Sequence, residues 1–413
     1  MLSADLFEIN GAQTIPRIEQ QLSELQDRRP QGLLLPVNLK ESWIGGQASL
    51  IQLIITWGKM NADATLVTHI KSDEEPTIQL SKLAKRPFGF SAIWMANSIK
   101  DRALIKDLKV VANRCTESQF DLMWRGAVRR EAVNQPSLFG DDDLEEYVIP
   151  GVTGSGAQVF LASVDHDRWL LPQCYFANEK LRERDDFTAL ARLCFQRAFK
   201  SAQHIPVPPS LFAPFGAIFH ELFKNTHQHA RKDIDGAFLR RSVRGMIVNR
   251  RSWSKESVNA VVHESPPLKD FTDDLLKNSA ANESLELLEI SVFDSGIGLA
   301  AHWLKGKWNQ ETTIITELKA CQDCMKQWAT STNLPHKGEG LFEVAQVLSQ
   351  LGGFMRLRTG RLSLYRNYRA NPCTQNEAES VRLFDWNSQS IQPTKMAEVA
   401  GVLFTMFIPV IKD

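Results

Sequence analysis

The order of apolar and polar residues divides the chain into two parts with different patterns. In the first part, residues 1–185, the apolar runs at 32–39, 64–70 and 158–163 predict strands. The run at 48–58 is apolar almost throughout, so its periodicity does not decide between a strand and a buried helix. Residues 102–114 have helical spacing. This alternation predicts a mixed α/β region with a regulatory or partner-binding role.

Helical spacing opens the second part, residues 186–413. Residues 186–203 and 210–230 predict two helices, because the prolines between them break the chain. This pattern is typical of an α+β fold, with helices layered on an antiparallel-compatible sheet. Further helices are predicted at 312–329 and 341–351, strands at 244–249, 287–293, 354–359, 361–365 and 402–409, and a polar loop or insertion at 263–286.

Composition and charge exclude several classes of protein. The 413 residues include 48 Lys+Arg and 48 Asp+Glu, so the formal net charge is zero. A neutral chain is not expected to bind nucleic acid over its whole surface, although a local basic patch would still permit contact. No apolar run approaches the ~20 residues of a membrane span, and the N-terminus lacks the pattern of a signal peptide. The six scattered cysteines are typical of reduced thiols, so we expect a cytoplasmic protein.

The first motif that suggests a chemistry is the pair Glu221 and Asn225, four residues apart in a predicted helix. Positions with this spacing share one face of a helix. The carboxylate can orient or deprotonate a water molecule, and the amide oxygen can bind a hard cation such as Mg²⁺. The same spacing is common on solvated helix faces, so the pair is weak evidence by itself.

Two glycine-rich turns follow this pair. The predicted strand at 287–293 runs into the sequence DSGIG, from Asp294 to Gly298. Its carboxylate can accept a hydrogen bond from the amine of a base, and its glycines allow the backbone to approach a ligand closely. The sequence KGEGL, from Lys337 to Leu341, precedes a predicted helix whose N–H groups can bind phosphates. Each turn alone is common, and neither matches a Walker A loop or a dinucleotide-binding fingerprint.

Together with a last strand near Gly401, these segments resemble the ATP-binding domains of the GHKL superfamily, named for gyrase, Hsp90, histidine kinases and MutL. That superfamily has, in order, an N box (ExxxN), a G1 box (DxGxG), a lid, a G2 box (GxGL) and a final strand. The resemblance covers about residues 186–413 and leaves residues 1–185 outside. It implies a two-layer α/β sandwich, the Bergerat ATP-binding fold, with ATP and Mg²⁺ as cofactors.

The resemblance also implies roles for individual residues. Glu221 matches the position that activates the attacking water, and Asn225 matches the Mg²⁺ ligand. Asp294 matches the carboxylate that reads adenine. The other positions expected around ATP are the basic residue His229, the pocket glycines Gly296 and Gly298, the lid residues Lys337, Gly338, Gly340 and Leu341, and Thr405 of the last strand.

The sequence departs from the family pattern in two places. Val402 follows Gly401 where the family usually has Thr or Ser, so a hydroxyl that helps to hold the base through water is missing. Thr405 lies further along the same strand. The N and G1 boxes are also farther apart than in a minimal kinase domain, and an insertion at 263–286 would explain the extra length.

ATP binding does not by itself define what the ATP is used for. The predicted helix at 186–203 contains no histidine to accept a phosphoryl group, which disfavours a standard sensor kinase. We therefore expect an ATPase that acts as an ATP-dependent conformational switch for a protein partner or a homodimer. Two alternatives are a kinase that phosphorylates a partner on His or Ser, and a non-hydrolysing scaffold that senses ATP.

Overall fold

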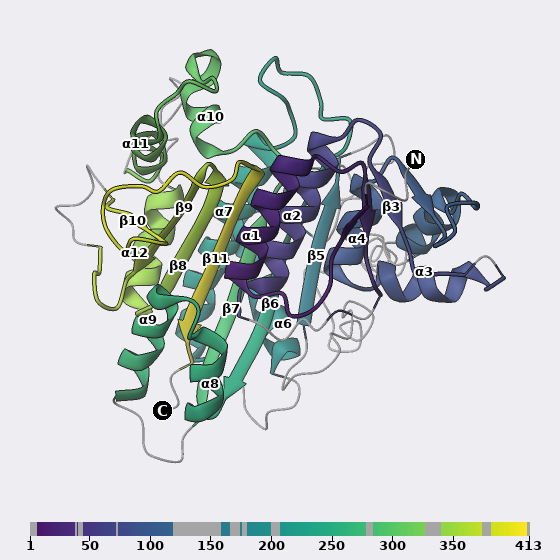
Figure 1. The fold of residues 1–413 in the computed structure, drawn as a ribbon. Helices are drawn as coiled ribbons and strands as arrows, with labels where there is room; N and C mark the ends of the chain where they lie inside the picture. Colours follow the sequence, from purple (N-terminus) through teal and green to yellow (C-terminus); the bar gives the residue numbers. More distant parts are fainter. Residues whose placement is uncertain are drawn as a thin grey trace.

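The protein is described by a computed structural model that covers residues 6–37, 39, 44–71, 73–118, 158–165, 174–175, 180–199, 207–277, 284–326, 340–373 and 381–410. Within these ranges the chain has an α+β fold with one parallel and one antiparallel sheet, shown in Figure 1. The predicted α+β class is confirmed. None of the helices in these ranges is long and apolar enough to span a membrane.

The N-terminal part forms the smaller sheet from four short parallel strands, which are neighbours in sequence order. Helices connect successive strands, so the α/β alternation predicted for this part is present. The strands are β1 (Leu6–Glu8), β2 (Gly32–Leu34), β3 (Thr65–Val67) and β4 (Ser98–Lys100), and the connecting helices are α1 (Ile15–Arg28), α2 (Gly46–Met60), α3 (Pro76–Ala84) and α4 (Pro87–Met95).

Helix α2 resolves the segment that the pattern left ambiguous. Residues 48–58 lie within it, and every residue from Gly46 to Gly58 is buried. The helix is covered on several sides, because it packs against α1, α4 and the central strand β11 (Val399–Pro409) of the larger sheet. A helix buried all round has no polar face, so its sequence lacks the amphipathic period by which helices are recognised.

The larger sheet has seven antiparallel strands in the order β10-β9-β8-β11-β7-β6-β5. The last strand of the chain, β11, lies between β7 and β8 near the middle of the sheet. Strand β5 precedes residue 185 and pairs with β6, so the sheet takes an edge strand from the N-terminal part; the boundary at residue 185 stays a prediction. The other strands are β5 (Gln158–Val164), β6 (Val243–Trp253), β7 (Leu285–Phe293), β8 (Phe354–Gly360), β9 (Leu362–Asn367) and β10 (Phe384–Asp385).

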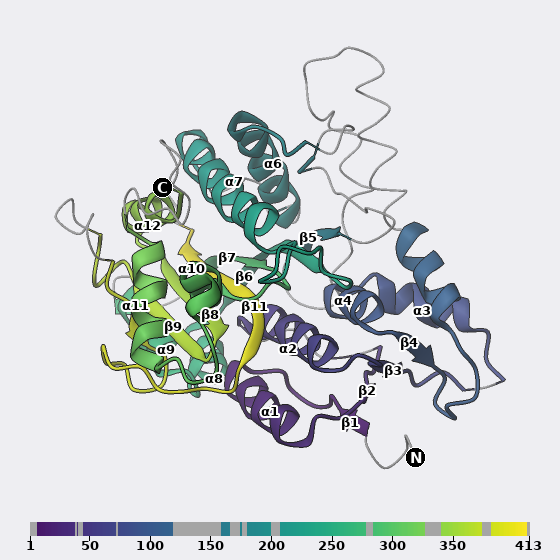
Figure 2. The same ribbon diagram turned by 90° about the horizontal axis from the view of Figure 1, so that it is seen from above.

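Helices cover both faces of the larger sheet, as Figure 2 shows. Helices α6 (Arg184–Ala198), α7 (Phe212–His229) and α12 (Gly340–Gln350) pack on one face with Val292 and Phe404. Helices α1 and α2 cover the other face, where Phe293 and Leu403 contribute to a second core. The alternation of side chains along β7 and β11 therefore separates the two cores. The N-terminal part adds a third layer to the two that were expected for residues 186–413.

The prediction of a polar loop at 263–286 is wrong. This stretch contains α9 (Pro266–Lys277) and the start of β7, and it follows α8 (Lys255–Val262). Helix α9 is mostly polar, but Leu268 and Phe271 are buried in a third core together with Phe354. Few apolar residues are needed to pack α9, because only one narrow stripe of the helix contacts the rest of the protein.

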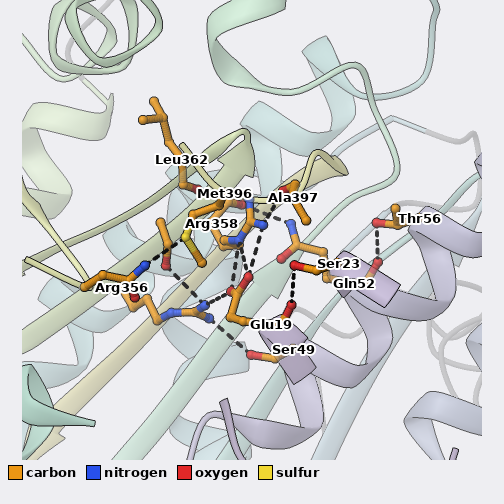
Figure 3. Close-up of polar contacts among 12 residues, drawn as sticks. Glu19, Ser23, Ser49, Gln52, Thr56, Arg356, Arg358, Leu362, Met396 and Ala397 are labelled. Carbon is orange, nitrogen blue, oxygen red and sulfur yellow. Dashed lines mark hydrogen bonds and ion pairs between the residues drawn. The ribbon is translucent and has the colours of Figure 1, made fainter. Parts of the chain in front are cut away.

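A buried ion-pair network attaches α1 to the larger sheet, as Figure 3 shows. Glu19 of α1 accepts hydrogen bonds from Arg356 Nη2 at 2.5 Å and from Arg358 Nε at 3.0 Å, both on β8. Arg358 also donates to the carbonyl oxygens of Gly360 and Ala397. Burial alone would raise the pKa of Glu19, but the two guanidinium groups outweigh it and lower the pKa below its ordinary value. Charged contacts as well as apolar packing therefore hold the N-terminal part in place.

Candidate functional site

A cavity of about 820 Å³ lies beside α7, α12 and the ends of β7 and β11. Helix α10 (Leu299–Leu304) also lines it. Four segments far apart in the sequence thus meet around one space. The predicted site residues that line the cavity are Glu221, Asn225, His229, Asp294, Gly296, Gly298, Gly340 and Leu341. Lys337 and Gly338 lie outside the described residues.

Glu221 and Asn225 line the cavity from successive turns of α7, as their spacing predicted. The Glu221 carboxylate is buried and accepts hydrogen bonds from His220 Nδ1 at 2.9 Å and from Lys224 Nζ at 3.3 Å. Burial raises the pKa of Glu221, but the hydrogen bond from His220 and the charge of Lys224 outweigh it, and the pKa falls below its ordinary value. The carboxylate is therefore ionised at neutral pH and can accept a proton.

Gly340 brings the start of α12 against Glu221. A methyl group at this position would collide with Glu221 Oε2, so glycine allows the carboxylate to stay where it is against the helix. The N-terminal end of α12 carries the partial positive charge of a helix and faces the same part of the cavity as Glu221. This end of the cavity therefore combines a carboxylate with a helix N-terminus.

Asp294 lies at the end of β7 and is only 6% exposed. Its Oδ1 atom accepts hydrogen bonds from the backbone N–H groups of Gly296 at 2.9 Å and Val402 at 3.1 Å. The Oδ2 atom makes no hydrogen bond to the described part of the chain. Burial raises the pKa of Asp294 to about 6, against the lowering effect of these two N–H groups. The carboxyl is thus oriented through one oxygen, and a ligand in the cavity can bond the other.

Two glycines allow the backbone to close around Asp294. Gly401 has a φ of +72°, and a side chain there would collide with the Asp294 carbonyl. A Cβ atom at Gly296 would lie 2.9 Å from the Cα of Ala230, at the end of α7. Val402 holds Asp294 through its backbone N–H.

Thr405 is not brought to the cavity. Its hydroxyl accepts a hydrogen bond from Ser291 at 3.2 Å on the opposite side of β11, whereas its neighbour Phe404 lines the cavity. Successive residues of a strand point to opposite faces of the sheet, which explains the placement. His229 does line the cavity, and its ring centre lies 4.3 Å from that of His302 on α10.

Cationic side chains outnumber carboxylates among the residues that line the cavity. Arg184 pairs with Glu343, Lys224 with Glu221, and Arg231 with Asp165, which lies outside the cavity lining. This balance favours an anionic ligand. The lining Lys and Arg residues are Arg184, Lys224, Arg231, Lys232 and Lys305, and the lining carboxylates are Glu221, Asp294 and Glu343.

No group of three or more His, Cys, Asp or Glu side chains suited to a metal ion occurs in the part of the chain that the structure describes. The amide oxygen of Asn225 is a single protein ligand, so further oxygen atoms would have to complete the coordination of any cation there. Such shared coordination is typical of Mg²⁺ at phosphates, because this ion keeps few protein ligands.

A buried polar cluster supports the cavity from β6. Arg244 donates to both oxygens of Asp165, at 2.6 and 2.8 Å. The Tyr175 hydroxyl lies 2.9 Å from Nδ1 of His227, which lines the cavity. Burial and the nearby guanidinium groups lower the pKa of His227 to about 4, so this side chain is neutral at pH 7.

Sequence reasoning missed part of the cavity wall. Helix α10 directly follows the turn from Asp294 to Gly298, and its six residues are too few to show a helical pattern. The loop after α7 contains an Asp-Gly turn, which is a local signal for a hairpin. The lining residues that were missed in these two segments include His302, Trp303, Lys305, Arg231, Lys232 and Phe238.

Comparison of the chain with protein-family models, with curated proteins and with solved structures finds no match.

Proposed function

We propose that the chain binds ATP with Mg²⁺ in this cavity and hydrolyses it, as a switch that acts on a protein partner or on a second copy of the chain. The hypothesis includes a Bergerat-type arrangement of residues 186–413. Support comes from the order of the motifs and from the antiparallel sheet, whose one face carries α6, α7 and α12 beside the cavity.

The placement of Asp294 is the observation that carries this proposal. Two backbone N–H groups fix its carboxyl through one oxygen, beside Gly296 and Gly401, and the residue lines the cavity. An exocyclic amine of a base, such as that of adenine, is a suitable donor to this oxygen. A buried carboxyl with a raised pKa at a cavity is also typical of a functional group.

The other end of the cavity suits phosphate chemistry. Glu221 is ionised and can orient a water molecule and accept its proton. The N-terminal end of α12 favours the phosphate oxygens, and Lys224 and Arg184, which pair with Glu221 and Glu343, line the same cavity. Asn225 would hold Mg²⁺, which when bound neutralises phosphate charge.

Two substitutions test the proposal. In the presence of Mg²⁺ and γ-labelled ATP, Asp294→Asn should weaken ATP binding by about tenfold or more, since the amide presents N–H donors to the base amine. Glu221→Gln should retain binding but lower the release of labelled phosphate by about 100-fold or more. The exposed Asp27→Asn on α1 is the matched control and should change neither quantity.

The distribution of the label separates the alternatives. Free phosphate that depends on Glu221 supports the ATPase. Label retained on protein would indicate a kinase, and ATP binding without transfer of label would indicate a scaffold. If the unaltered chain binds no ATP, the assignment of the cavity is wrong.

A further inference from the structure

A short hairpin between α7 and β6 forms part of the cavity wall. Lys232 and Phe238 pair as an isolated β-bridge across it. The turn is fixed from within, because Asp233 Oδ1 accepts the N–H of Ala237 at 2.9 Å and Gly236 adopts a φ of +85°. The position of Phe238 is therefore set by the backbone of the turn.

The far end of the hairpin is attached to the N-terminal part. Arg241 donates to the carbonyl oxygen of Met95 at 2.8 Å and to that of Asn61 at 2.8 Å. These carbonyls lie at the C-terminal ends of α4 and α2, where helices carry partial negative charge. A guanidinium group bonded to two helix ends keeps the hairpin in a fixed place beside the cavity.

Phe238 is 56% exposed although it lines the cavity. The cationic groups of Arg231 and Lys232 lie 5.4 and 5.1 Å from its ring centre, within the range of cation–π contact. A large aromatic ring in a cavity wall presents apolar area and a π-face to any flat group of a ligand.

The hairpin lies at the Asp294 end of the cavity. It begins directly after Ala230, whose backbone contacts the turn at Gly296. Glu221 is roughly 13 Å away from Ala230 along the axis of α7, at 1.5 Å per residue. The hairpin that carries Phe238 therefore begins beside the turn that follows Asp294, and the last turns of α7 separate that point from Glu221.

We propose that Phe238 stacks on the base of the nucleotide bound in this cavity and is a base-binding residue of the site. Asp294 bonds the edge of the base, whereas the Phe238 ring contacts its face. This inference rests on the proposed function, because it assigns the base a place in the same cavity.

Binding measurements by isothermal titration calorimetry test the proposal with the full chain, Mg²⁺ and three ligands: ATP, ADP and tripolyphosphate. Phe238→Ala should raise the dissociation constants of ATP and ADP by about tenfold and by the same factor, since base–aromatic stacking contributes at this level. Tripolyphosphate, which has no base, should bind with unchanged affinity. Phe238→Trp should restore the affinity for ATP and ADP.

Ile234→Ala is the matched control, because Ile234 belongs to the same turn, is 48% exposed and does not line the cavity. Its affinities should equal those of the unaltered chain. An affinity for ATP within twofold of the unaltered chain in Phe238→Ala would overturn the stacking role and leave the proposed function intact. An equal loss for tripolyphosphate would overturn it as well, because the effect would then act through the neighbouring cations. Absence of ATP binding in the unaltered chain would refute both proposals.

Discussion

At the scale of single residues, the ionisation of Asp294 should make ATP binding in the cavity depend on pH. Burial raises its pKa to about 6, and the amine of a base can donate only to an oxygen that accepts. ATP affinity should therefore fall as the pH is lowered from 7 to 5. At one pH unit below the pKa the affinity should be about tenfold lower than at neutral pH. Calorimetric titrations across this range measure the effect. Tripolyphosphate is the control for titration of the phosphates, and an identical pH profile for both ligands would contradict the role of Asp294.

The same carboxyl should limit the stability of the fold. Its pKa is higher in the folded chain than the value of 3.8 for an exposed carboxyl, so its favourable contribution is complete below pH 3.8 and is lost as the pH rises through about 6. Asp294→Asn keeps an acceptor for the two backbone N–H groups and buries no charge. We expect it to raise the free energy of unfolding by about 1–3 kcal/mol at pH 7.

Urea unfolding at pH 7 and at pH 4 measures this gain. It should be present at pH 7 and should shrink markedly at pH 4, where the carboxyl of the unaltered protein is protonated. A substitution that stabilises the protein while it removes ATP binding would mark Asp294 as functional. A loss of stability at pH 7 would instead show that its carboxylate supports the fold.

At the scale of elements, the attachment of α1 to β8 depends on one carboxylate. Glu19→Gln would leave the buried guanidinium groups of Arg356 and Arg358 without a counter-charge. Removal of one partner of a buried ion pair is strongly destabilising, so we expect the free energy of unfolding to fall by about 3–5 kcal/mol. Chemical denaturation measures it, and Glu24→Gln on the exposed face of the same helix should change stability by less than about 0.5 kcal/mol. Equal stability of the two variants would show that apolar packing alone attaches α1.

The sequence identifies elements and site residues where their signal is local. The spacing of Glu221 and Asn225 places both on one wall of the cavity, because a helix turn determines it. The prediction that Thr405 lies at the cavity is wrong, because side chains alternate along β11 and Thr405 points to the face opposite Phe404. The hairpin that carries Phe238 has a recognisable turn, but its place beside Asp294 depends on long-range packing that no local pattern encodes.

At the scale of the whole molecule, the N-terminal part contacts the segment that holds Asp294. Thr56 Oγ1 on α2 accepts the N–H of Ala400 at 3.1 Å, directly before Gly401 and Val402. Gln52 of the same helix donates to the carbonyl of Arg358 at 3.0 Å. The layer that covers one face of the sheet is thus bonded to the backbone that shapes the cavity on the other face.

This contact predicts that a change in α2 alters nucleotide affinity. Thr56→Val keeps the shape of the side chain but removes the acceptor. The partly buried N–H of Ala400 then loses its partner, and the segment at 399–402 is held less firmly. We expect ATP affinity to fall about fivefold, which corresponds to the roughly 1 kcal/mol of one hydrogen bond. Thr56→Ser retains the hydroxyl and should bind ATP like the unaltered chain.

Because linkage is reciprocal, ATP should also slow the hydrogen exchange of the amides at 397–402, and this slowing should be smaller in Thr56→Val. If Thr56→Val bound ATP normally, the N-terminal layer would support the sheet without influencing the site.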